Sequence, residues 1–143
     1  MNLGYSYSWR MPAGDLAQVR AVVEALHQRA VELGGEVGDV IVLSGDEAQA
    51  VRLGARQAVL FTATVPGASV GKYGLASTGD SSWSWSGAMV ISSARTVSQL
   101  HAAAASLGLE VAEGYAGMVF TSKKNASGVV EVEQREAFDW TDF

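Results

Sequence analysis

The chain contains two histidines, His27 and His101, and histidine is the side chain best suited to acid–base chemistry near neutral pH. Each lies at the border of an apolar helical stripe, four residues after Val23 and Val97 respectively. Neither is followed three or four residues later by a carboxylate or a second histidine, so the spacing predicts no helical metal pair. We therefore expect no metal and no other cofactor, and His101 is the single candidate for a catalytic residue.

A segment at residues 67–73 resembles a phosphate-binding loop, because it follows an expected strand and reads Gly-Ala-Ser-Val-Gly-Lys-Tyr. Its spacing is one residue short, and Tyr73 stands where such a loop carries a magnesium-binding hydroxyl. The residues that follow would not begin a helix able to hold an anion at its N-terminus. We interpret Lys72 as a solvated surface cation and expect no nucleotide here.

Five large aromatic rings share single faces of two expected strands. The rings are Tyr5, Tyr7 and Trp9 in residues 5–11, and Trp83 and Trp85 in residues 83–92. Serine occupies most of the positions between them, and neighbouring strands would join the rings into one cluster. The cluster is either the core face beneath the helices, or an exposed face that would bind a flat ligand, a sugar or a second subunit. The alternation shows which residues share a face but not which way that face points.

Hydrophobic periodicity predicts the elements that position these groups. Period-two alternation or short apolar runs indicate strands at residues 5–11, 37–43, 58–65, 83–92, 115–122 and 129–135. Of these, we expect 37–43 and 115–122 to be interior strands, and the last to be an edge strand reached by a turn at 123–128. Stripes of period 3.6 indicate long helices at 16–33 and 96–107 and a short one at 44–53.

Helix ends are marked by residues that favour caps. Asp15 precedes the first helix, and Gly34 with Gly35 follows it. A serine or threonine three residues before a glutamate or glutamine predicts a capping box for each of the other two helices. The pairs are Ser44 with Glu47, and Thr96 with Gln99.

Residues 66–82 form the one long stretch without a periodic pattern, and they are rich in glycine and serine. Long irregular loops inside compact domains are usually functional or mobile. A pocket is therefore expected between this loop and the helix at 96–107. In it, His101 would be the acid–base residue and Lys72 or Asp80 its electrostatic partner.

Composition narrows the classes of protein further. The 143 residues suit one domain, residues 1–143, and 48% of them are hydrophobic against 17% charged. A net charge of −5 with scattered basic residues argues against a nucleic-acid partner. No apolar run approaches membrane-spanning length, and the start of the chain has no signal-peptide pattern, so we expect a soluble, cytoplasmic protein. Because cysteine is absent, we expect no disulfides.

The order of elements predicts an α+β fold in which a mixed or antiparallel sheet carries two main helices on one face, an elaborated ferredoxin-like sandwich. Such architectures host unrelated functions, so this comparison implies none. The first functional hypothesis is a non-enzymatic binding or assembly module that forms a homodimer or meets a protein partner through the sheet aromatics or the tail at residues 138–143. The alternative is a small enzyme or small-molecule-binding domain that uses the pocket beside residues 66–82.

Overall fold

The computed structural model describes residues 3–114, 122–124 and 130–132, and its main feature is a seven-stranded antiparallel sheet. The strands are β1 (Leu3–Met11), β2 (Glu36–Val37), β3 (Ile41–Ser44), β4 (Gln57–Thr64), β5 (Gly71–Ser77), β6 (Trp83–Ile91) and β7 (Glu110–Gly114). They lie in the order β2-β4-β5-β6-β1-β7, and β3 also pairs with β4. The expected α+β class with an antiparallel sheet is confirmed.

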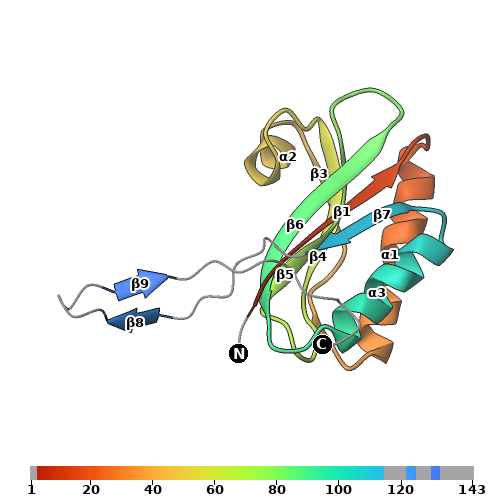
Figure 1. Ribbon diagram of the computed structural model, residues 1–143. Helices are drawn as coiled ribbons and strands as arrows, with labels where there is room; N and C mark the ends of the chain where they lie inside the picture. Colours follow the sequence, from red (N-terminus) through yellow and green to blue (C-terminus); the bar gives the residue numbers. More distant parts are fainter. Residues whose placement is uncertain (1–2, 115–121, 125–129, 133–143) are drawn as a thin grey trace.

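Three helices accompany the sheet, namely α1 (Leu16–Glu32), α2 (Gly45–Val51) and α3 (Arg95–Ser106). Helices α1 and α3 contact each other and lie on one side of the sheet, whereas α2 lies apart from them beside β3 (Figure 1). We call the sheet face turned away from α1 and α3 the open face. In β1 and β6 it carries the side chains of Ser6, Ser8, Ser84, Ser86 and Ala88.

The ends of α1 follow from its sequence. The Asp15 carboxylate accepts the backbone N–H of Gln18 at 2.8 Å, and the Gln18 side chain accepts the N–H of Asp15 at 2.9 Å. At the other end Gly34 has φ +87°, and the N–H of Gly35 donates to the carbonyl of Ala30 at 2.9 Å. This is the Schellman arrangement. It needs a residue in the left-handed backbone conformation, which glycine adopts without strain.

The core lies between the sheet and the two long helices. Alternate residues of β1, including Leu3, Tyr5 and Trp9, point toward the helices and are fully buried or nearly so. The stripe of α1 that meets them is Val19, Val23, Leu26 and Ala30. The stripe of α3 is Val97, Leu100, His101 and Ala104.

The expectation of a long irregular loop at residues 66–82 was wrong, because β5 occupies Gly71–Ser77 in its middle. Six of the seven β5 residues are buried, so residues on both faces of the strand are covered, with the exception of Lys72. A strand buried on both faces does not alternate polar and apolar residues, so its sequence lacks the period-two signal. Several β5 residues are also small, so the sequence lacks the run of large apolar residues that would otherwise indicate a buried strand.

Other expectations needed smaller corrections. Residues 37–43 are not an interior strand: β2 and β3 share this region, and Ile41 and Val42 are exposed. The two predicted capping boxes do not form, because neither Ser44 at α2 nor Ala94, the N-cap of α3, makes a side-chain cap hydrogen bond. Strand β7 at Glu110–Gly114 was not predicted.

Part of the predicted C-terminal hairpin can be compared with the structure. Strands β8 (Ser122–Lys124) and β9 (Val130–Val132) pair antiparallel, with Ser122 opposite Val132. Lys123 and Lys124, which were predicted to belong to the turn at 123–128, are part of β8. The rest of that turn, the rest of the strand predicted at 115–122, and the tail at 138–143 lie outside the described residues.

Within the described part of the chain, no helix combines the length and apolar character that crossing a bilayer requires.

Candidate functional site

All five rings identified in the sequence are buried in the structure, with at most 6% of their surface exposed. Trp9 lies opposite Trp85 in the β1–β6 pair, so the rings share the face that meets α1 and α3. This agrees with the interpretation of the rings as a core face. The alternative interpretation requires exposed rings that form a binding surface, and none of these five rings is exposed.

His101 lies in the middle of this aromatic cluster. The indole N–H of Trp9 donates to His101 Nδ1 at 2.8 Å, and the ring centroids of Tyr7 and Tyr5 lie 4.6 and 5.6 Å from that of His101. Burial lowers the pKa of His101 to about 3. Because Nδ1 accepts the indole proton, the neutral ring carries its own proton on Nε2, which has no partner among the described residues. A neutral, enclosed imidazole does not supply a proton near pH 7.

The tyrosines of the cluster are also neutral near pH 7. Burial raises the pKa of Tyr73 to about 12 and that of Tyr7 well above its ordinary value. The pKa of Tyr5 is raised first by burial and then by the negative charge of Glu113. The cluster is therefore a core with internal hydrogen bonds.

The sheet has a gap between β5 and β6. The two strands pair at Ala76 with Ser84, and the next bridge is Ala68 with Ile91, beyond the start of β5. Between these points the side chains of two buried rings replace the backbone ladder: the Tyr7 hydroxyl and the Trp85 indole N–H both donate to the carbonyl of Lys72, the latter at 3.1 Å. We call this stretch, residues 70–75 and 85–90, the sheet gap.

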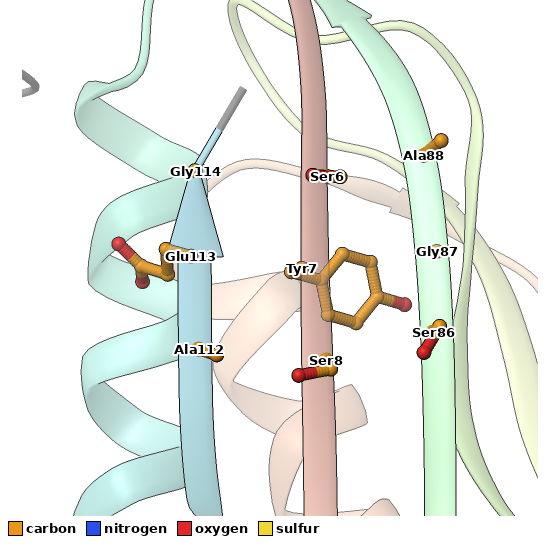
Figure 2. A pocket seen from close by; sticks show the side chains of 9 residues that line it. All are labelled: Ser6, Tyr7, Ser8, Ser86, Gly87, Ala88, Ala112, Glu113 and Gly114. Carbon is orange, nitrogen blue, oxygen red and sulfur yellow. The ribbon is translucent and has the colours of Figure 1, made fainter. Parts of the chain in front are cut away.

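Gly87 lets Tyr7 reach the sheet gap. A Cβ atom at position 87 would overlap the Tyr7 ring and would lie 2.8 Å from its hydroxyl oxygen. Figure 2 shows the Tyr7 ring extending from β1 toward Gly87 on β6, while the Glu113 side chain points the other way. The absence of a side chain at this position is thus needed for the hydrogen bond that ends at Lys72.

Two hollows lie at the sheet gap. The smaller one, of about 300 Å³, is lined by Thr62, Val70, Gly71, Lys72, Trp85, Ser86, Gly87 and Ala88. A shallower one, of about 500 Å³, is lined by Ser6, Tyr7, Ser8, Ser86, Gly87, Ala88, Ala112, Glu113 and Gly114 (Figure 2). The two share Ser86, Gly87 and Ala88, so they adjoin on the open face, and together we call them the composite hollow. Its total size is that of an ordinary small-molecule site.

The structure does not bring His101, Lys72 and Asp80 together in a pocket. Lys72 lines the smaller hollow, whereas His101 points into the core on the other face. Asp80 lies in the exposed turn between β5 and β6, where the Ser82 hydroxyl and N–H donate to its carboxylate at 2.8 and 3.0 Å and lower its pKa. Of the three expected site residues, Lys72 alone lines a hollow.

Several residues of the composite hollow were missed from the sequence, chiefly Ser86, Gly87 and Ala88. Gly87 did carry a signal, because it interrupts the series of large side chains at alternate positions of its strand. A glycine inside a strand often marks the close approach of another group. Here that group is the ring of Tyr7.

The composite hollow has few ionisable groups. Across the described residues, no cluster of three or more histidine, aspartate or glutamate side chains is arranged to hold a metal ion. Comparisons of the chain with protein-family models, with curated proteins and with solved structures found no match. The function must therefore be argued from the geometry alone.

Proposed function

We propose that this protein is a non-enzymatic binding module that holds a small, flat molecule in the composite hollow over the sheet gap. The observation that carries the proposal is the sheet gap itself. In a continuous antiparallel ladder, the backbone groups of neighbouring strands pair with each other, whereas the β5–β6 ladder does not extend along this stretch, which borders a hollow. Backbone groups beside an apolar wall are typical of small-molecule sites.

The ionisable side chains at the composite hollow support binding over catalysis. The lining residues with such side chains are Lys72, Tyr7 and Glu113, but Tyr7 and Glu113 lie opposite each other in the β1–β7 pair, on the sheet face that carries the rings. Burial raises the pKa of Tyr7 well above its ordinary value, and its hydroxyl is bonded to the Lys72 carbonyl, so it is not free to transfer a proton. General acid–base catalysis needs two ionisable groups close to one substrate, and of these three residues Lys72 alone has its side chain on the open face.

Self-association is the second candidate, and it uses the same open face. Val70 and Val90 are 65% and 44% exposed, and Val90 lines a further hollow of about 260 Å³ beside the composite hollow. Apolar side chains around a face of small residues suit the close packing of two sheets. Light scattering during size-exclusion chromatography tests this candidate: a concentration-dependent dimer that Val90→Lys dissociates would favour it over the first.

We also propose that the fold is an elaborated ferredoxin-like sandwich. The four strands β7, β1, β6 and β5 lie in the order expected of a βαββαβ unit, with α1 after the first strand and α3 between the third and the fourth. The segment from β2 to β4 would then be an insertion between α1 and the second strand. This description concerns architecture, and the binding proposal does not depend on it.

The binding proposal is tested by two-dimensional ¹H–¹⁵N NMR with a set of neutral and charged aromatic fragments. We expect fragments to shift the amide signals of Ser86, Gly87 and Ala88 and the indole signal of Trp85. Ala88→Leu should abolish these shifts, because the new side chain fills the composite hollow. Ala102→Leu is the control, since it makes the same change at an exposed position of α3 that does not line the composite hollow. Fragments that bind elsewhere, or nowhere, would refute the proposal.

A further inference from the structure

We infer that the ligand of the composite hollow is a planar molecule with a primary carboxamide edge and a separate anionic group. The inference rests on the proposed function and specifies the ligand. It starts from the direction of the β6 backbone groups at the sheet gap, which the hydrogen bonds at both ends of the gap determine.

The backbone groups of Ser86 and Ala88 point into the sheet gap. At one end, the carbonyl of Ser84 accepts from Arg52 on the β5 side, at 2.7 Å. At the other, the carbonyl of Val90 accepts the N–H of Ser69 at 2.8 Å, and its N–H donates to the Ser69 hydroxyl at 3.1 Å. Since successive residues of a strand direct these groups to opposite sides, positions 86 and 88 face the same way as 84 and 90.

These groups lie outside the ladder that joins β5 and β6. That ladder has the single pair Ala76 with Ser84, so it does not extend to Ser86 or Ala88. Each of the two residues therefore presents one donor and one acceptor side by side toward the gap. Both residues line both parts of the composite hollow, so a ligand there can reach them.

A primary carboxamide matches a donor and an acceptor presented side by side. Its oxygen accepts the N–H of a strand residue while its NH₂ group donates to the carbonyl of the same residue, as a backbone does in an antiparallel pair. A carboxylate would place an acceptor against the strand carbonyl, and a purely apolar group would leave both backbone groups without a partner. The edge chemistry thus favours an amide over either.

Lys72 supplies the second element of recognition. Its side chain lines the smaller hollow and is exposed, and none of the ion pairs formed within the described residues includes it. An ammonium group at the edge of a hollow attracts an anionic group on the bound molecule. The floor between Lys72 and the strand is made of small side chains at Ser86 and Ala88, which leave room for a flat body.

Three probes separate these features: 4-carbamoylbenzoate, which has both; benzamide, which lacks the anion; and 4-(dimethylcarbamoyl)benzoate, which lacks the amide donor. Dissociation constants come from NMR titration. We expect 4-carbamoylbenzoate to bind tightest, with the dimethyl compound about fivefold weaker for the loss of one hydrogen bond. Benzamide should be about two- to fivefold weaker for the loss of an exposed ion pair.

Amide hydrogen exchange gives a direct readout of the backbone contacts. With 4-carbamoylbenzoate at ten times its dissociation constant, exchange at the contacted amide, Ser86 or Ala88, should slow about tenfold. Exchange that is not slowed at either of these amides would overturn the carboxamide assignment.

Lys72→Met tests the anionic group and leaves the backbone edge intact. It should remove the difference in affinity between 4-carbamoylbenzoate and benzamide, while Lys123→Met, the same change on β8, should preserve it. If all three probes bind at the sheet gap with equal affinity, or if Lys72→Met changes nothing, the inference fails and the binding proposal stands. If none binds there while other fragments do, the inference again fails alone. If no fragment of any kind binds there, both fail.

Discussion

At the scale of single residues, His101 illustrates how burial changes the role of a reactive side chain. Its Nδ1 accepts the Trp9 indole proton, and its ring is enclosed by Tyr5, Tyr7 and Tyr73. A charged imidazole would have to give up this hydrogen bond in a buried site surrounded by aromatic rings. The residue therefore joins α3 to β1 within the core and contributes to stability.

This environment predicts a pH dependence of folding stability. The pKa of His101 is about 3 in the folded protein against 6.5 for an ordinary histidine, so between these values the unfolded chain binds a proton that the folded chain does not. The free energy of unfolding should fall by up to about 1.4 kcal/mol for each pH unit below 6.5, until about pH 3. Urea denaturation at a series of pH values measures this slope.

Two variants distinguish the contribution of His101 to this pH dependence from that of the carboxylates, which also titrate in acid. His101→Phe should reduce the slope, because the group that takes up the proton is gone. Leu100→Ala, at a neighbouring buried position on α3, should lower stability at every pH and keep the slope. An unchanged slope in His101→Phe would show that His101 does not carry the effect.

Gly74 predicts a second effect at this scale. A Cβ atom at position 74 would overlap the backbone oxygen of Val59 and lie 2.6 Å from the Cβ of Leu60. Gly74→Ala should therefore lower the free energy of unfolding by about 1–3 kcal/mol, since the β4 backbone must move. Gly114→Ala, with no neighbour within 4 Å, is the matched control and should cost little. Equal unfolding midpoints for the two variants would refute the expected crowding.

At the scale of elements, two helix starts that look similar in sequence differ in the structure. Asp15 and Gln18 form a complete capping box on α1, whereas Ser44 makes no cap hydrogen bond on α2. Asp15→Ala should therefore destabilise the protein by about 1 kcal/mol, and Ser44→Ala should have almost no effect. Thermal unfolding compares the two; a loss from Ser44→Ala as large as that from Asp15→Ala would contradict the assignment.

The sheet gap makes a prediction about β6 that needs no ligand. Gly87 and Met89 direct their N–H groups toward β1, opposite Tyr7 and Tyr5, whereas those of Ser86 and Ala88 face the gap. Amide exchange at 86 and 88 should be at least about a hundredfold faster than at 87 and 89, because exposed amides exchange without local unfolding. Uniform protection along β6 would mean that the ladder to β5 is closed.

At the scale of the whole molecule, the two faces of the sheet have different roles. One carries the large rings and is covered by α1 and α3. The other carries serine, glycine and alanine around the sheet gap, with Lys72 beside it. Figure 1 shows both long helices on the same side of the sheet, so among the described residues neither long helix covers the open face. The proposals made above all concern this open face.

Much of this organisation could be predicted from the sequence. The stripe of α1 and the alternation in β1 and β6 report burial on one side of an element, which the periods 3.6 and 2 express directly. The same signal shows which rings share a face of each strand, but the alternation does not say that β1 and β6 are neighbours, which the structure shows. By contrast, β5 is buried on both faces and β7 is short and mostly exposed, so neither has a distinctive period.

The sequence by itself determined the class of fold, the long helices and which side chains share a face, because local periodicity encodes them. The tertiary structure alone decided which face the helices cover, that β5 and β6 separate at Gly87, and that Lys72 and not His101 lines a hollow. These outcomes depend on contacts between residues far apart in the chain, such as Tyr7 with Lys72, and no local pattern specifies such contacts.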